Sequence, residues 1–235
     1  MALPFFYKED IDLSATEVIL DEDTSKHIAQ VLRMQVREQL QLTDGKGNVF
    51  TATIKDANRK KCAVVVLTTN HKSQTTNRIN IAISLIKTTS RFEWFLEKAT
   101  ELGVSEIIPL LCERTEKQHF RLDRMKNILV SAMLQSQQCW LPVLHEPVKF
   151  DKVILSSAQQ QKFIAHCIEA EKRNLVDLIK ESLPSRIILI GPEGDFSPAE
   201  IQLAIQQHFI PVALGDTRLR TETAGIVAAT LLRLI

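Results

Sequence analysis

Alternation of apolar and polar positions, which is typical of a half-buried strand, recurs along residues 1–72. Two alternating runs lie on either side of the turn cluster Asp44-Gly45-Lys46-Gly47-Asn48, and this arrangement predicts a β-hairpin. One segment, residues 25–34, has helical spacing instead. Several short strands with one helix predict a small, partly open β-barrel, an architecture that often binds oligonucleotides; a stabilising appendage without a ligand is the alternative. The expected strands are 39–43, 50–54 and 62–67, and the expected apolar helix face is Ile28, Val31 and Leu32.

The pattern changes after a polar stretch at residues 71–78, which we interpret as a domain linker. From residue 79 onward, strand-like runs alternate with segments of helical periodicity. Such alternation predicts a mostly parallel sheet covered by helices on both faces, so residues 73–235 are expected to form an α/β domain. The expected strands are 79–86, 107–111, 163–167, 187–190 and 210–214, and the expected helices are 91–102, 122–136, 175–183, one beginning at 198, and 224–235.

Two of the expected strands run directly into loops that contain glycine. Residues 187–190 precede Gly191-Pro192-Glu193-Gly194-Asp195-Phe196, and Ser197-Pro198-Ala199-Glu200 then has the pattern of a capping box that begins a helix. Residues 210–214 precede Gly215 and a polar segment in the same way. Because ligands of open α/β sheets bind at the carboxyl ends of the strands, the two loops predict one small-molecule site.

The first of these loops is a poor match for a phosphate site. It has neither the Gly-x-x-x-x-Gly-Lys-Ser/Thr nor the Gly-x-Gly-x-x-Gly spacing. Glu193 would also place a negative charge where a phosphate would bind, which disfavours ATP and dinucleotides; its alternative role is that of a helix-dipole partner. A ligand with a positive centre and an adenosine fits better, and S-adenosylmethionine has both. The expected apolar walls are Leu189, Ile190, Leu214 and Leu219.

Several motifs occur in a characteristic order along the chain. They are His27-x-x-x-Val31-Leu32-Arg33, Thr100-Glu101-Leu102-Gly103-Val104, Glu113-Arg114-Thr115, Gln135-Ser136, Gly191-Pro192-Glu193-Gly194, Leu214-Gly215 and Leu219-Arg220-Thr221-Glu222-Thr223-Ala224. With this set the chain resembles the SPOUT methyltransferases that act on N3 of a uridine in 16S ribosomal RNA of the small subunit, the RsmE family. The ordered set covers nearly the whole chain, which makes it more specific than any single motif.

The resemblance implies a fold, a cofactor and partners. Residues 1–72 would form a PUA-like RNA-binding domain, and residues 73–235 a SPOUT domain with a C-terminal trefoil knot. The implied cofactor is S-adenosylmethionine, the implied assembly is a homodimer, and the implied substrate is small-subunit ribosomal RNA, either free or in the assembled subunit. The implied cofactor-binding residues are His166, Ile190, Gly191, Pro192, Glu193, Gly194, Leu214, Gly215, Leu219, Arg220, Thr221 and Thr223.

The implied reaction requires that uracil N3 loses its proton and that negative charge on the ring is stabilised. Arg220 is the expected stabiliser, and Glu222 would orient that arginine or accept the proton; a structural Arg220–Glu222 ion pair is the alternative. His166 has an alternative role as a satisfied histidine at a strand end. The expected RNA contacts, each of which is otherwise a solvated surface residue, are Arg33, Lys87, Arg91, Arg114 and Gln135.

The chain departs from the family pattern in several places. Asp195 stands where a second glycine usually follows Gly-Pro-Glu-Gly, so it adds a negative charge beside the cofactor loop. Gln137-Gln138-Cys139-Trp140 replaces a stretch that usually contains Gly-Arg. This change removes an expected RNA contact and leaves Trp140, which could stack on a base. Leu134 stands where Glu or Lys is more common. The departures affect the expected RNA contacts rather than the class of activity.

Composition narrows the range of functions. The net charge of the 235 residues is +1 and no region is markedly basic, so a basic RNA-binding surface would have to be assembled by folding or dimerisation. No apolar run reaches the ~20 residues that span a bilayer, and the N-terminus does not resemble a signal peptide. The four cysteines form no Cys-x-x-Cys pair, so we expect a cytoplasmic protein without a metal. The alternatives are a SPOUT enzyme that methylates another RNA position, such as a tRNA ribose, and a non-catalytic RNA-binding or ribosome-assembly factor.

Overall fold

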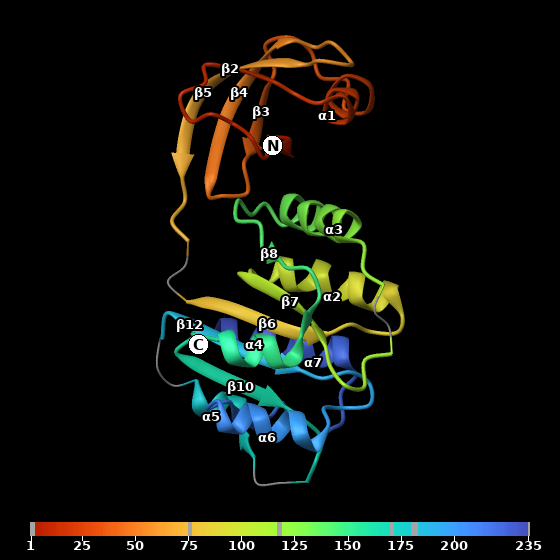
Figure 1. The fold of residues 1–235 in the computed structure, drawn as a ribbon. Helices are drawn as coiled ribbons and strands as arrows, with labels where there is room; N and C mark the ends of the chain where they lie inside the picture. Colours follow the sequence, from red (N-terminus) through yellow and green to blue (C-terminus); the bar gives the residue numbers. More distant parts are fainter. Residues whose placement is uncertain (1–2, 75–76, 117–118, 170–171, 180–182, 235) are drawn as a thin grey trace. The chain divides into compact units, whose positions relative to one another are not determined.

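A computed structural model of the chain contains two compact units. It describes residues 3–74, 77–116, 119–169, 172–179 and 183–234. The first unit comprises the described residues up to Gln74 together with Met133–Leu141, and the second comprises the remaining described residues (Figure 1). The predicted linker at 71–78 includes residues 75–76, which lie outside the described residues.

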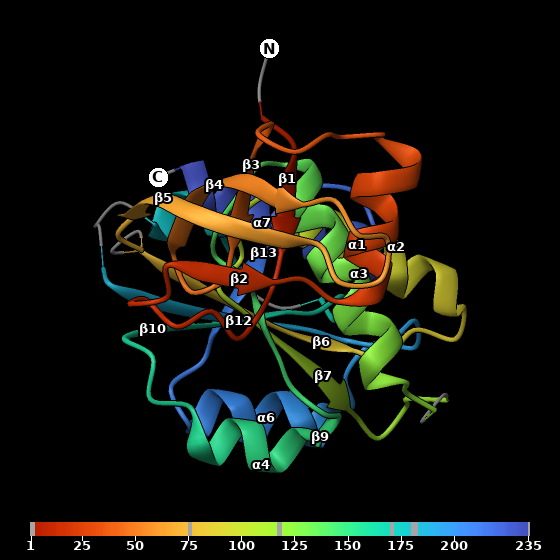
Figure 2. The same cartoon turned by 90° about the horizontal axis from the view of Figure 1, so that it is seen from above.

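The first unit is built on a five-stranded sheet in the order β1-β3-β4-β5-β2. β1 pairs with β3 in parallel and the other pairs are antiparallel, so the sheet is a curled, open barrel, as predicted (Figure 2). The alternation in the predicted hairpin is confirmed, because the apolar side chains of β3 and β4 face one core. The strands are β1 Phe5–Tyr7, β2 Glu17–Ile19, β3 Gln39–Thr43, β4 Asn48–Asp56 and β5 Ala63–His71.

The helix expected at residues 25–34 was only partly correct. Helix α1 spans Glu22–Lys26, and a π-helical turn over His27–Val31 follows it, with the N–H of Leu32 donating to the carbonyl of His27. Ile28 is buried as expected, but Val31 and Leu32 are 66% and 43% exposed. A π-turn has a wider period than an α-helix, so residues spaced for an α-helix no longer share one face.

Residues 133–141 add a further segment to the first unit. The indole N–H of Trp140 donates to the carbonyl of Lys72 over 2.9 Å, and its ring packs edge-to-face with His71. Gly47 has a φ of +94°, and a Cβ there would lie 2.4 Å from the Trp140 ring. These contacts make Trp140 a packing residue of the first unit.

The second unit has an eight-stranded sheet in the order β11-β13-β10-β12-β6-β7-β8, with β9 also pairing with β7. Every recorded pair is parallel, which confirms the predicted sheet type. The strands expected from the apolar runs are β6 Arg78–Ser84, β7 Glu106–Leu111, β10 Gln161–Ala165, β12 Ser185–Ile190 and β13 Ile210–Ala213. The short strands not expected are β8 Val143–Leu144, β9 Val148–Lys149 and β11 Arg173–Asn174.

Helices cover this sheet on both faces. Side chains of α4 and α6 join Ile187 and Leu189 of β12 in one core cluster, so these two helices cover the same face (Figure 2). On the other side α7 packs against β6, β12 and α2, where Gly225 approaches the ring of Phe95. The helices are α2 Thr89–Glu101, α3 Leu122–Gln135, α4 Phe150–Ser156, α5 Leu175–Leu178, α6 Pro198–Gln206 and α7 Thr221–Leu234.

Most of the predicted helices are confirmed. The capping box at α6 is present in both directions, and Gly103 follows α2 with a φ of +74°. α4 was not predicted, because its seven residues are too few for a clear helical period. The helix expected at 175–183 is observed as α5, and residues 180–182 of that range lie outside the described residues, as does Ile235 of the last helix. No described helix is long and apolar enough to cross a membrane.

Candidate functional site

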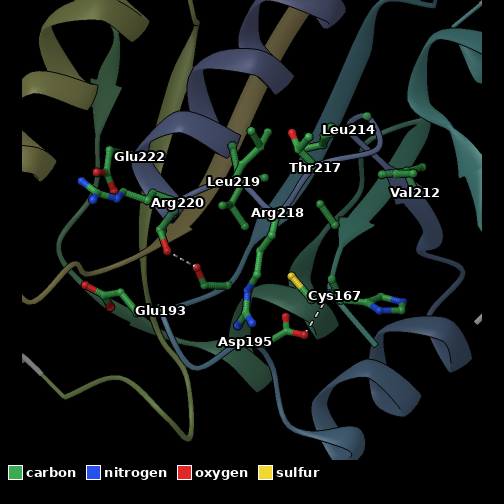
Figure 3. A pocket seen from close by; sticks show the side chains of 18 of the residues that line it. Cys167, Glu193, Asp195, Val212, Leu214, Thr217, Arg218, Leu219, Arg220 and Glu222 are labelled. Atoms are coloured by element: carbon green, nitrogen blue, oxygen red, sulfur yellow. Dashed lines mark hydrogen bonds between the residues drawn. The ribbon is translucent and has the colours of Figure 1, made fainter. Parts of the chain in front are cut away.

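The second unit contains a cavity of about 630 Å³ at the carboxyl ends of β10, β12 and β13. These three strands are neighbours in the sheet, so the loops that follow them meet at one edge. The first residues of α7 complete the wall, and Figure 3 shows the side chains around the cavity. The two glycine-containing loops predicted to form one site therefore do so.

The loop after β12, residues 191–196, is tied to the loops that follow two other strands. A carboxylate oxygen of Glu193 accepts a hydrogen bond from the backbone N–H of Lys87 over 3.0 Å. The guanidinium of Arg114 donates to the carbonyl of Gly194 over 2.8 Å. Glu193 is thus engaged by a loop amide rather than by the amino end of α6, so the helix-dipole alternative does not describe its contact.

The same loop has two further ties, one at each end. The Thr221 hydroxyl at the start of α7 donates to the carbonyl of Gly191 over 3.0 Å. Asp195 Oδ2 accepts from the backbone N–H of Cys167 over 2.8 Å, which links the loop to the end of β10 (Figure 3). These four ties hold the loop in a fixed shape, which is what a preformed ligand site requires.

Three of the backbone amides at the start of α6 are already paired. Phe196 N–H donates to the Asp195 carboxylate, Ser197 N–H to the Glu200 carboxylate, and Glu200 N–H to the Ser197 hydroxyl. A phosphate at a helix amino end needs free N–H groups. This geometry therefore agrees with the prediction that the loop disfavours nucleotide phosphates.

His166 follows β10 and faces the cavity wall while only 8% exposed. Its Nδ1 is buried without a hydrogen-bond partner among the described residues, so the alternative of a satisfied histidine is wrong. Burial lowers the pKa of His166, the ammonium of Lys172 lowers it further, and Asp195 acts in the opposite direction. His166 is therefore neutral at pH 7, with a ring nitrogen able to bond to a ligand.

Glu222, near the start of α7, is 6% exposed and lines the cavity. Its Oε1 lies 3.6 Å from Nε of Arg91 on α2, and its Oε2 is buried without a hydrogen-bond partner among the described residues. The expected ion pair with Arg220 is thus replaced by one with Arg91. The sequence could not indicate this partner, because α2 and α7 are far apart in the chain.

Arg220 is exposed at the cavity wall. Within the described part of the chain its side chain makes no hydrogen bond or ion pair. Arg218 and Arg220 both line the cavity, and Figure 3 shows that the side chain of Arg218 points toward Asp195. Arg220 is therefore available for a substrate.

The cavity includes most of the cofactor-binding residues expected from the sequence. Gly194 and Thr223 are the two outside the lining, although Gly194 belongs to the tied loop. Sequence reasoning missed Cys167 and Lys172 beyond His166 and the residues 216–218 before α7, because nothing in their local pattern marks a ligand. The expected residues in the lining are His166, Ile190, Gly191, Pro192, Glu193, Leu214, Gly215, Leu219, Arg220 and Thr221, and the additional ones are Arg91, Ala165, Cys167, Lys172, Asp195, Val212, Ala213, Asp216, Thr217, Arg218, Glu222 and Ala224.

The five expected RNA contacts are divided between the two units. Lys87, Arg91 and Arg114 lie in the second unit, where Lys87 also pairs with Glu116 over 2.8 Å. Arg33 and Gln135 are exposed residues of the first unit, and Arg33 has a φ of 53°. No group of three or more His, Cys, Asp or Glu side chains suited to a metal ion occurs among the described residues.

Comparison with known proteins identifies the class. Residues 73–233 match the family model described as an RNA methyltransferase domain, and residues 20–67 match the one described as an RNA methyltransferase PUA domain. The fold and its site therefore define a two-domain RNA methyltransferase. Over 207 residues the chain is 32% identical to ribosomal RNA small subunit methyltransferase E of Synechocystis, covering 86% of this chain and 68% of that protein. The chain belongs to the ribosomal RNA small subunit methyltransferase E family.

Two crystal structures are similar over nearly their whole length. One is described as a probable rRNA-methyltransferase from Porphyromonas gingivalis; it is 40% identical with a TM-score of 0.89, covering 97% of this chain and 95% of that one. The other is ribosomal RNA small subunit methyltransferase E from Neisseria gonorrhoeae bound to S-adenosyl methionine. It is 28% identical with a TM-score of 0.86, again covering 97% of this chain and 95% of that one.

Proposed function

We propose that this protein transfers the methyl group of S-adenosylmethionine to N3 of a uridine in small-subunit ribosomal RNA. The observation that carries the proposal is the cavity in the second unit. Two buried polar atoms on its wall, Nδ1 of His166 and Oε2 of Glu222, have no hydrogen-bond partner among the described residues. Family membership and a relative described as bound to S-adenosyl methionine support the same assignment.

The residues of the cavity fit this cofactor. Ile190, Leu214 and Leu219 supply apolar wall, and the tied loop presents backbone groups that suit an adenine edge. Glu193 gives the loop a negative charge, which favours a cation over a phosphate. When bound, S-adenosylmethionine supplies an electrophilic methyl group on a positively charged sulfur.

The chain's own residues would handle the proton and the charge of the uracil ring. Arg220 is exposed at the cavity and its side chain has no recorded partner in the described ranges, so its guanidinium can stabilise the negative charge that develops on the ring. Glu222 has one oxygen near Arg91, and its other oxygen meets no hydrogen-bond donor in the part of the chain that the structure describes, so Glu222 can accept the N3 proton through this second oxygen. The earlier alternative, in which Glu222 orients Arg220, has no ion pair to support it.

Binding of ribosomal RNA is proposed for both units. The first unit, with Arg33 and Gln135, would act as the PUA-like domain, and domain boundaries at 1–72 and 73–235 belong to this proposal. Lys87, Arg91 and Arg114 would contact RNA phosphates near the cavity. Arg91 and Arg114 would have a second role in stabilising the site. Arg91 already contacts Glu222 of the cavity, and Arg114 contacts Gly194 of the loop after β12.

We further propose a trefoil knot in the second unit, a homodimer and a cytoplasmic location, where ribosomal RNA is methylated. Helix α7 supports the dimer, because Ile226, Val227 and Leu231 are only partly buried although apolar. Light scattering at micromolar concentration should give twice the mass of the chain, and the mass of one chain would contradict the dimer.

Mass mapping of ribosomal RNA tests the reaction. Small-subunit RNA from cells that lack this protein should carry one unmodified uridine, which purified protein and S-adenosylmethionine should convert to N3-methyluridine. Methylation at a ribose or in tRNA would instead identify a SPOUT enzyme that acts on another RNA position. If no methyl group is transferred to free RNA or to assembled subunits, the protein would be a non-catalytic RNA-binding factor. Calorimetry should also show that S-adenosylhomocysteine binds and ATP does not; tighter binding of ATP would contradict the cofactor assignment.

A further inference from the structure

Asp195 adopts a backbone conformation that most residues avoid. Its φ is 66°, in the left-handed region that costs an L-residue energy and that glycine adopts freely. A strained aspartate at the edge of a ligand cavity therefore calls for a role of its carboxylate.

The carboxylate of Asp195 joins two loops of the site. Oδ2 accepts from the backbone N–H of Cys167 over 2.8 Å, and Oδ1 accepts from the backbone N–H of Phe196 over 2.9 Å. The N–H of Asp195 itself donates to the carbonyl of Pro192, so the residue is fixed within its own turn. One side chain thus connects the end of β10 with the loop after β12.

The residue held by this connection is the neighbour of His166. The side chain of His166 is 8% exposed and lines the cavity, and its Nδ1 has no hydrogen-bond partner within the described ranges. On its other side the ammonium of Lys172 donates to the carbonyls of His166 and Ile168 over 2.8 and 3.0 Å. Residues 166–168 are therefore held by Asp195 from the loop after β12 and by the ammonium of Lys172.

We propose that Asp195 is a positioning residue for cofactor binding. Its hydrogen bond to Cys167 N–H holds the backbone so that the His166 ring faces the ligand. This proposal rests on the proposed function, since the ligand is S-adenosylmethionine or its product. This role depends on the carboxylate oxygen as a hydrogen-bond acceptor and not on the negative charge of Asp195. The side chain of Arg218 points toward that charge (Figure 3).

Two substitutions separate the acceptor from the charge. Asp195→Gly relieves the strain of the left-handed backbone and removes the hydrogen-bond acceptor. Asp195→Asn keeps an amide oxygen for the N–H of Cys167 and removes the charge. His208→Gly is the matched control. His208 has the same φ of 66°, lies after α6 outside the cavity lining, and its exposed side chain makes no hydrogen bond within the described part of the chain.

Calorimetry with S-adenosylmethionine and S-adenosylhomocysteine, together with thermal unfolding, is the test. We expect Asp195→Gly to bind both compounds about tenfold more weakly, the size of one hydrogen bond, with an unfolding temperature as high as that of the wild type. Asp195→Asn and His208→Gly should bind as the wild type does. A loss for S-adenosylmethionine alone in Asp195→Asn would overturn the proposal in favour of direct attraction to the sulfonium.

Wild-type affinity in Asp195→Gly would also overturn the proposal, as would a loss of affinity that follows a fall in unfolding temperature. Failure of the proposed function gives a different result, because the wild type itself would then bind neither compound. The control His208→Gly shows whether a new glycine at a position with this φ weakens binding through general flexibility. Weaker binding by His208→Gly would count against a specific role of Asp195.

Discussion

The Nε atom of Arg91 lies 3.6 Å from Oε1 of Glu222, and Oε2 of the same buried carboxylate accepts no hydrogen bond from the described residues. The pair joins α2 to α7 at the cavity wall. Because buried polar atoms normally have partners, an unpartnered oxygen in a cavity indicates a place for a ligand or substrate group. Glu222 is thus oriented by one oxygen while the other remains available.

Substitution of Glu222 by glutamine tests proton transfer. Glu222→Gln keeps the size of the side chain and loses the ability to accept a proton at pH 7. We expect single-turnover methylation to slow by about 10²–10⁴-fold with little change in cofactor affinity. Arg91→Ala is the comparison, because it removes the ion-pair partner and leaves the carboxylate. It should reduce the rate less than Glu222→Gln, and equal rates for wild type and Glu222→Gln would remove the base from the mechanism.

Arg220→Ala should lower kcat much more than it weakens cofactor binding. The exposed guanidinium makes no ion pair within the described part of the chain, so its loss should leave the unfolding temperature nearly unchanged. Loss of one preorganised donor costs about 10²–10³-fold in rate. Arg220→Lys should restore little, because an ammonium cannot reproduce the planar fork. Cofactor titration and single-turnover assays on the same preparation measure the affinity and the rate separately. Unchanged turnover in Arg220→Ala would exclude a catalytic role of Arg220.

The pH dependence of stability should contain a contribution from His166. The pKa of His166 in the folded protein is lowered from 6.5, chiefly by burial, so the unfolded chain binds the proton more readily. The contribution of His166 to the free energy of unfolding is therefore fully present above pH 6.5. This contribution is lost as the pH falls from 6.5 toward the pKa of His166 in the folded protein. Thermal unfolding of wild type and His166→Gln between pH 5 and 8 measures this, and the variant should lack that part of the decline. Parallel curves would contradict the assignment.

Gly47→Ala should destabilise the first unit. A Cβ at this position would lie 2.4 Å from the Trp140 ring, and the φ of +94° is unfavourable for alanine. We expect a loss of about 2–4 kcal/mol in the free energy of unfolding, from overpacking and backbone strain together. Trp140→Ala removes the atoms that the new methyl group meets. The double variant should therefore lose less than the sum of the two single variants, and strict additivity would show that the contact is absent in solution.

Local chemistry was enough to predict much of this structure. The alternation in β3 and β4, the apolar strands of the parallel sheet and the capping box at Ser197 follow from short-range rules, and all are observed. The meeting of two glycine-containing loops in one cavity also followed, because parallel neighbouring strands place their carboxyl ends at the same edge. The motif order along the chain carried the family resemblance, which the family models confirm.

Contacts between distant segments were decided only by the tertiary structure. Glu222 pairs with Arg91 rather than with Arg220, and Trp140 packs on Gly47. The π-turn at His27 exposes Val31 and Leu32, although their spacing suits a buried face. The sequence by itself determined the strands, the loops and the types of residue at the site, since these depend on neighbours along the chain. The contacts of the two Glu222 oxygens and the hydrogen bond from Cys167 to Asp195 depend on residues that only folding brings together. No local pattern could therefore specify them.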